Sequence, residues 1–198
     1  MPTLESPARP RLWLARHGET EWSTLGRHTG RTDIPLTERG EAQARALGAL
    51  LAGETFVEVL ASPRRRALDT CRLAGFGDRC VVDDDLREWD YGADEGRTTP
   101  EIQVDRPGWS IWRDGPLDGE TLEHVARRAD HLVTRVRAGG GDVLCVAHGH
   151  LLRVVAARWL GLPPEDGRLF LLEPATVSIL GWDRDTAVIE RWNQPGAG

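Results

Sequence analysis

The chain has 198 residues, and all 25 of its basic residues are arginine, against 31 acidic residues and a formal net charge of −6. The absence of lysine excludes Schiff-base lysines, the Walker A phosphate loop and Ser–Lys hydrolase dyads. The acidic balance argues against nucleic acid or an anionic membrane as a partner, and any anion held by a side-chain cation is held by arginine or histidine.

Elements can be predicted in chain order from the apolar pattern and the breakers. Residues 1–10, with three prolines, are predicted to be a flexible leader. Strands are predicted at residues 11–15, 56–61, 81–82 and 143–147, and two or three edge strands within residues 170–192. Helices are predicted after Thr37 as N-cap, from Ser62 with Pro63 at the first helical position, at residues 120–137, and at residues 151–160.

The helix after Thr37 is expected to bury one face, formed by Ala42, Ala46, Leu47, Leu50 and Leu51. Residues 83–117, rich in Gly, Pro and Trp, are expected to be irregular.

Strands that alternate with helices, several of them continuous apolar runs, predict an α/β fold with three layers, α/β/α, and a mostly parallel central sheet. We predict one domain over residues 11–193, with residues 83–117 as a small cap and residues 194–198 as a tail. In such folds the functional site lies at the carboxyl ends of the strands.

Two predicted strands end in a histidine followed by glycine. In Arg16-His17-Gly18, the neighbouring arginine favours a neutral imidazole, which is a nucleophile, and glycine allows a sharp turn. A capped surface histidine is the alternative interpretation. His148-Gly149-His150 opens a helix, where an anion can bind; zinc ligation by His-x-His or a structural role are equally compatible with this pattern alone.

Two further segments carry candidate chemistry. Arg64, Arg65 and Arg66 follow a strand, and because successive helical residues are spread by ~100°, at most one or two of them face a site. Arginine suits a two-pronged grip on phosphate. In residues 83–92 a carboxyl beside tryptophan could serve as a general acid, although each single carboxylate in this acidic run is more simply a solvated surface group.

Together these segments resemble the histidine phosphatase superfamily, in its phosphoglycerate mutase-like branch, over about residues 11–192. The resemblance rests on residues 16–20 (RHGET), 26–44 (GRHTGRTDIPLTERGEAQA), 62–67 with Thr70, 86–88 with Gly92, Glu95 and Gly96, and 147–149 (AHG). It places the family's motif arginine on Arg66, its acid on Glu88 and its second histidine on His148.

The resemblance implies a phosphoglycerate mutase-like fold and a mechanism without metal or cofactor. His17 would attack phosphorus and become phosphohistidine, while Arg16, Arg66 and His148 hold the phosphoryl oxygens. Glu88 would protonate the leaving oxygen and then activate water, which releases inorganic phosphate. The Gly18 carbonyl is expected to orient the His17 imidazole.

The compact middle of the chain favours a phosphatase of small phosphorylated metabolites, because the resemblance implies that mutases of this type are longer chains with an insertion in the middle. Residues 28–30, 83–92, 112–115 and 148–153 resemble the sugar-phosphate branch typified by sedoheptulose-1,7-bisphosphatase and acid phosphatase. That likeness leaves the preference for mono- or bisphosphates open. The residues predicted to bind substrate are Gly18, Thr20, Arg27, His28, Thr29, Tyr91, Gly149, His150 and Arg153.

Alternatives remain at this point. They are a phosphoglycerate mutase, a non-catalytic module that binds phospholigands, and a metallohydrolase using His148 and His150. Trp89, Trp109 and Trp112 are interpreted as packing residues of the core or cap, with cover over the site or stacking on a sugar as the alternative.

A cytoplasmic location is predicted from three features. No apolar run approaches the ~20 residues that span a bilayer, and residues 1–10 lack the apolar core of a signal peptide. Cys71, Cys80 and Cys145 are odd in number and have no metal-ligand spacing, which indicates reduced thiols. Whether the chain forms a homodimer is left open by the sequence.

Overall fold

The computed structural model describes residues 9–196. Most of the leader predicted at residues 1–10 and the end of the tail predicted at residues 194–198 therefore lie outside the described residues.

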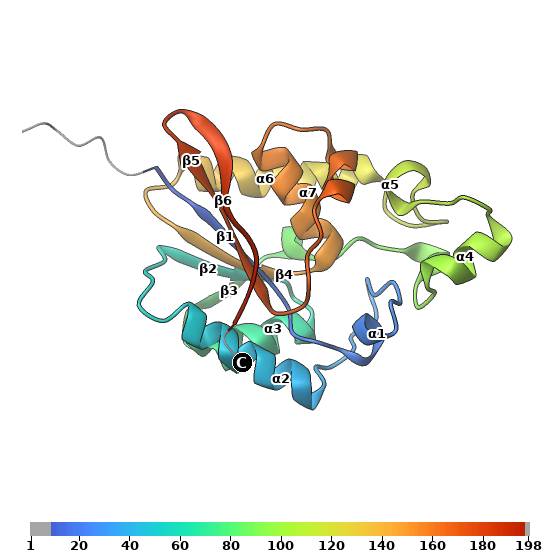
Figure 1. Ribbon diagram of the computed structural model, residues 1–198, viewed down its shortest axis with the longest axis horizontal. Coiled ribbons are helices and arrows are strands. Elements are labelled where there is room, and N and C mark those ends of the chain that lie inside the picture. Colours follow the sequence, from blue (N-terminus) through green and yellow to red (C-terminus); the bar gives the residue numbers. More distant parts are fainter. Residues whose placement is uncertain (1–8, 197–198) are drawn as a thin grey trace, which may run out of the picture.

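One six-stranded, mostly parallel sheet forms the centre of the molecule, in the order β3-β2-β4-β1-β5-β6 (Figure 1). The first four strands of this order are mutually parallel, whereas β5 is antiparallel to both β1 and β6. The strands are β1 (Leu12–Arg16), β2 (Glu58–Ala61), β3 (Cys80–Val82), β4 (Val143–Ala147), β5 (Thr176–Asp183) and β6 (Thr186–Pro195). The α/β prediction with a mostly parallel sheet is confirmed.

Helices cover both faces of this sheet, with α2 and α3 on one side and α6 and α7 on the other (Figure 1). The α-helices are α1 (Glu21–Thr24), α2 (Glu38–Leu50), α3 (Arg65–Cys71), α4 (Thr99–Asp105), α5 (Ile111–Asp114), α6 (Leu122–Ala138) and α7 (Gly149–Trp159). The remaining turns are a π-helix, η1 (Arg72–Phe76), and four 3₁₀ helices, η2 (Gly77–Arg79), η3 (Asp84–Leu86), η4 (Gly92–Asp94) and η5 (Pro164–Leu169).

Alternating side chains of each strand feed two separate cores. On β1, Leu12 and Leu14 pack in the cluster with α6 and α7, whereas Trp13 and Ala15 pack in the cluster with α2 and α3. The strand β4 is buried along its whole length, as a strand covered on both faces must be.

The segment at residues 170–192 differs from its prediction. Of the two strands in this segment, only β6 is an edge strand, because β5 lies between β1 and β6. The first six residues of β5 are buried. A strand buried on both faces reads as a continuous apolar run, and Thr176 and Ser178 obscure that signal here.

The buried face of α2 was predicted only in part: Leu47 and Leu51 are buried and Leu50 packs, partly buried, against the same core. Gly40, Ala44 and Leu47 are buried, followed by Leu51 just past the helix, whereas Ala42 is exposed. The observed spacing of four, three and four residues forms one stripe along a helix. The packing surface of α2 therefore includes a glycine, which hydrophobicity alone does not reveal.

The start of α3 also differs from prediction. The helix begins at Arg65 with Arg64 as its N-cap, so Pro63 precedes the helix instead of opening it. The Ser62 hydroxyl accepts the Arg64 N–H at 3.3 Å. This turn frees the following residues to point back toward the sheet edge.

The segment at residues 83–117 is more ordered than predicted, because it contains α4 and α5 (Figure 1). The start of α4 has a sequence signature that the prediction overlooked: Thr98 and Glu101 form a capping box, with Pro100 in the first turn. Asp94, almost fully buried, pairs with Arg106 within this segment, and backbone hydrogen bonds of His28 with Gly96 and Arg97 tie the segment to the rest of the chain.

Candidate active site

The two histidines of the strand ends lie side by side, because β1 and β4 are adjacent and parallel. His17 follows β1 and donates its backbone N–H to Ala147 at 3.0 Å, while His148 follows β4 and is the N-cap of α7. Their ring centroids are 5.2 Å apart. The topology therefore brings together residues that are 131 positions apart in the chain.

His17 is buried, with 5 % of its surface exposed, and its Nδ1 lies 2.7 Å from the Gly18 carbonyl oxygen. A carbonyl only accepts, so Nδ1 carries the proton and Nε2 presents a lone pair. Burial, and then the guanidinium groups of Arg66 and Arg16, hold the pKa of His17 well below its ordinary value of 6.5. The imidazole is therefore neutral near pH 7, as a nucleophile must be.

Three further contacts fix the backbone around His17. The Gly18 N–H donates to the Thr70 hydroxyl at 3.0 Å. The Ala175 N–H is shared between the carbonyls of Arg16 and His17, with Ala175 itself in the left-handed region at φ 51°. A Cβ on Gly18 would lie 2.3 Å from the Gly40 carbonyl oxygen, so only glycine fits there.

Arg66 and His148 form a buried pair behind His17. Arg66 is fully buried and donates from Nε to His148 Nδ1 at 3.2 Å. Since Nδ1 accepts, His148 donates from Nε2 to the Ser62 hydroxyl at 2.7 Å. The remaining donors of Arg66 bind the carbonyls of Thr29 and Thr32. Arg66 and His148, which were predicted to hold the phosphoryl oxygens, are thus fixed in position by hydrogen bonds to uncharged acceptors.

Arg16, the last residue of β1, has donors left to bind a ligand. One terminal nitrogen donates to the Leu172 carbonyl, whereas Nε is buried and has no partner among residues 9–196. An unpartnered buried donor beside His17 is costly in the absence of an anion.

Glu88 occupies the N-terminus of α7. One carboxylate oxygen accepts the N–H groups of Trp89 at 2.9 Å and Leu151 at 3.0 Å, and the other accepts that of His150 at 3.0 Å. An anion was one of three interpretations of this helix start, beside a zinc site and a structural role, and the group seated on these two helical N–H groups is a carboxyl side chain of the protein. Glu88 thereby lies fixed on the wall of the cavity.

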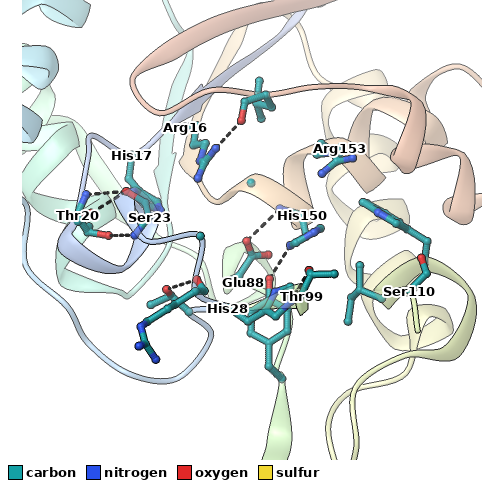
Figure 2. A pocket seen from close by; sticks show the side chains of 18 of the residues that line it. Arg16, His17, Thr20, Ser23, His28, Glu88, Thr99, Ser110, His150 and Arg153 are labelled. Carbon is teal, nitrogen blue, oxygen red and sulfur yellow. Dashed lines mark hydrogen bonds between the residues drawn. The ribbon is translucent and has the colours of Figure 1, made fainter. Parts of the chain in front are cut away.

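A cavity of about 520 Å³ opens in front of His17 (Figure 2). The predicted residues that line it are Arg16, His17, Thr20, Arg27, His28, Thr29, Glu88, Tyr91, Gly149, His150 and Arg153. Gly18, Arg66 and His148 do not line it and lie behind His17. The lining residues that sequence reasoning did not assign to the site are Ser23, Gly26, Thr99, Gln103, Trp109, Ser110, Ile111, Trp112 and Leu172.

Most of these missed residues come from α4, α5 and the turn between them. The capping box at Thr98 is a sequence signal for α4 that the prediction overlooked, and no sequence signal indicates that the segment folds back over the strand ends. Trp109 and Trp112 line the cavity in addition to packing, whereas Trp89 is fully buried and donates to the Glu120 carbonyl.

His28, Tyr91 and His150 form a polar cluster in the wall of the cavity. The Tyr91 hydroxyl lies 2.7 Å from His150 Nδ1, and the rings of His28 and Tyr91 are 4.8 Å apart. Burial lowers the pKa of His28 to about 4 and that of His150 well below 6.5, and it raises the pKa of Tyr91 well above 10. All three groups are therefore neutral near pH 7.

His148 and His150 point to different partners, Arg66 with Ser62 and Tyr91 respectively, so they do not converge on a common ligand position. Within residues 9–196 no group of three or more His, Cys, Asp and Glu side chains is placed to hold a metal ion. In the same part of the chain, no helix combines the length and the apolar character needed to cross a membrane.

The chain matches the family model of the histidine phosphatase superfamily, branch 1, over residues 12–195. It is 45 % identical to an acid phosphatase of Mycobacterium tuberculosis, covering 93 % of this chain and 94 % of the relative. It is 38 % identical to sedoheptulose 1,7-bisphosphatase of Saccharomyces cerevisiae, covering 82 % and 70 % of the two chains. Among solved structures, the product of an open reading frame from Mycobacterium tuberculosis superposes with a TM-score of 0.90 at 42 % identity, covering 95 % and 99 %.

Proposed function

The chain belongs to branch 1 of the histidine phosphatase superfamily, and from this premise we propose that it is a metal-independent phosphatase that hydrolyses small phosphate monoesters through phosphohistidine on His17. The observation that carries the proposal is the neutral imidazole of His17, whose Nδ1–H is held by the Gly18 carbonyl while Nε2 is left free.

In the proposed first step, Nε2 of His17 attacks phosphorus in line and the bond from phosphorus to the ester oxygen breaks. Arg16 supplies its unpartnered Nε, and Arg66 supplies positive charge from behind His17. His148 donates to a phosphoryl oxygen once its Nε2–H leaves the Ser62 hydroxyl. Glu88 gives a proton to the leaving alcohol.

In the second step, the Glu88 carboxylate takes a proton from water, whose oxygen attacks the phosphohistidine and releases inorganic phosphate. The backbone N–H groups that hold Glu88 support its carboxylate form after the first step. Because the charge of the phosphoryl group is offset by arginine, the sequence of steps requires no metal ion.

Sugar phosphates are the substrates that we propose for this site. Two named relatives, an acid phosphatase and a sedoheptulose bisphosphatase, act on phosphate esters as their names state. A cytoplasmic location is part of the proposal and is supported by three free cysteines.

The test is turnover of a panel of phosphate monoesters by the wild type and by His17→Ala. We expect hydrolysis that EDTA leaves unchanged and vanadate inhibits, and we expect none from the variant. His131→Ala is the matched control, because His131 is exposed and pairs with Asp85 outside the site. Activity in His17→Ala would refute the proposal, and phosphoryl transfer between phosphoglycerates in place of hydrolysis would favour the mutase.

A further inference from the structure

The end of the cavity formed by α4 and α5 carries hydrogen-bonding groups that the fold itself does not use. Ser110 and Gln103 both line the cavity there. Ser110 lies across the cavity from His17 (Figure 2). Neither takes part in the proposed chemistry. Their surroundings indicate what they are available to bind.

Ser110 is the N-cap of α5, a position where serine normally accepts an N–H from the helix through its hydroxyl. Its hydroxyl makes no such bond. The Ser and Thr N-caps of the other described helices all use theirs, namely Thr20, Thr37, Thr98 and Thr121. At Ser110 the side chain of Asp114 instead binds the backbone, accepting the Ser110 N–H at 2.8 Å. The Ser110 hydroxyl is left able both to donate and to accept.

Gln103, on α4, is held in one orientation. Its Nε2 donates to the Trp109 carbonyl at 2.9 Å, which fixes the side-chain amide against the turn that leads to Ser110. The amide oxygen has no partner among residues 9–196. Gln103 is exposed and lines the cavity, and its amide oxygen can accept from a hydroxyl or amine hydrogen.

The groups between this end and His17 restrict the ligand further. His28, His150 and Tyr91 are uncharged near pH 7, because burial has moved the pKa of each away from neutrality. A hydroxyl group satisfies both a donor-acceptor such as Ser110 and an acceptor such as Gln103. A bare aryl or alkyl group would satisfy neither.

We propose that Ser110 and Gln103 determine specificity by hydrogen bonding to hydroxyl groups of the leaving alcohol, so that the enzyme prefers phosphate esters of polyhydroxylated compounds. The inference rests on the proposed phosphatase function, since it concerns the part of the substrate that departs from phosphorus. In this proposal the cap segment selects among phosphate esters, and the residues at the strand ends carry out the chemistry that is common to all of them.

The experiment compares kcat/KM for ribose 5-phosphate, glucose 6-phosphate and fructose 6-phosphate with that for phenyl phosphate, which has no hydroxyl group. Ser110→Ala and Gln103→Leu should each lower kcat/KM for the best sugar phosphate by about 3- to 10-fold and leave phenyl phosphate within about 2-fold. Val104→Ala, also on α4 but 81 % exposed and outside the cavity, is the matched control and should change neither value.

The outcomes separate the two proposals. Equal losses on sugar and phenyl phosphates, or no loss on either, would overturn the role of Ser110 and Gln103 while leaving the phosphatase intact. A wild type that hydrolyses phenyl phosphate but none of the sugar phosphates would also overturn it. A wild type inactive on every ester would refute the proposed function itself.

Discussion

Thr70 connects the two halves of the site, and replacing it with valine tests that connection. Thr70 is 1 % exposed; its hydroxyl accepts the Gly18 N–H at 3.0 Å and donates to the Arg66 carbonyl at 2.7 Å. Valine keeps the shape but leaves the Gly18 N–H buried without a partner. Such a group costs about 1–3 kcal/mol, so we expect Thr70→Val to lose about that much free energy of unfolding.

Activity should fall for a separate reason. The carbonyl of Gly18 orients the imidazole of His17, and freeing the N–H of the same residue lets that carbonyl move. Small misplacements of a reacting group are expensive, so kcat should fall about 10- to 100-fold with KM within about 2-fold. Thr70→Ser restores the hydroxyl and should recover most of kcat.

The assay combines urea unfolding, followed by tryptophan fluorescence, with initial rates on phenyl phosphate. A Thr70→Val enzyme with unchanged kcat would refute the claim that this hydroxyl holds the nucleophile in place. An equal loss of kcat in Thr70→Ser would show that side-chain volume, and not the hydrogen bond, matters at this position.

Three further results are expected. The pKa of His28 is about 4 in the folded protein against 6.5 in the unfolded chain, so the neutral imidazole contributes its full stability above pH 6.5. As the pH falls from 6.5 to 4, protonation of His28 in the unfolded chain should lower the free energy of unfolding by up to about 3 kcal/mol. Denaturant titrations should show this loss, and His28→Gln should lack the part of the loss that is due to His28. Arg66 lowers the pKa of His17, so Arg66→Met should raise it and move the acid limb of kcat/KM to higher pH, whereas an unmoved limb would contradict the assignment of that limb to His17. Gly40→Ala would ordinarily stabilise a helix by about 1 kcal/mol, but the new Cβ would lie 2.1 Å from the Glu19 carbonyl oxygen. Thermal unfolding should therefore show a lower Tm for this variant. A higher Tm would mean that the backbone at Glu19 moves to accommodate the methyl group.

The sequence predicted the parts of the site that follow directly from strand ends. Apolar runs located β1 and β4, and the rule that sites lie at carboxyl ends of strands brought His17 and His148 to one edge of the sheet. The long-range hydrogen bonds could not be predicted, because nothing local to Glu88 indicates that its carboxylate sits on the N–H groups of α7.

The cap was the least predictable part. The signal for α4 was present in Thr98 and Glu101. The packing of Gln103 and Ser110 around the cavity depends instead on how residues 83–117 contact the rest of the chain, through backbone hydrogen bonds such as those of His28 with Gly96 and Arg97. These are tertiary contacts with no periodicity of their own. The face of α2 was predicted only in part for a similar reason, since its contact with the backbone of Gly18 and Glu19 is made by Gly40 and not by an apolar side chain.

The proposal that His17 becomes phosphorylated can be tested directly by rapid acid-free quenching of the enzyme during turnover of a phosphate ester, followed by peptide mass mapping. We predict a phosphoryl group on the peptide that contains His17, stable in alkali, labile in acid, and absent from His17→Ala. A phosphoryl group on another residue, or turnover in which single-turnover quenching finds no phosphoenzyme at any time, would contradict it.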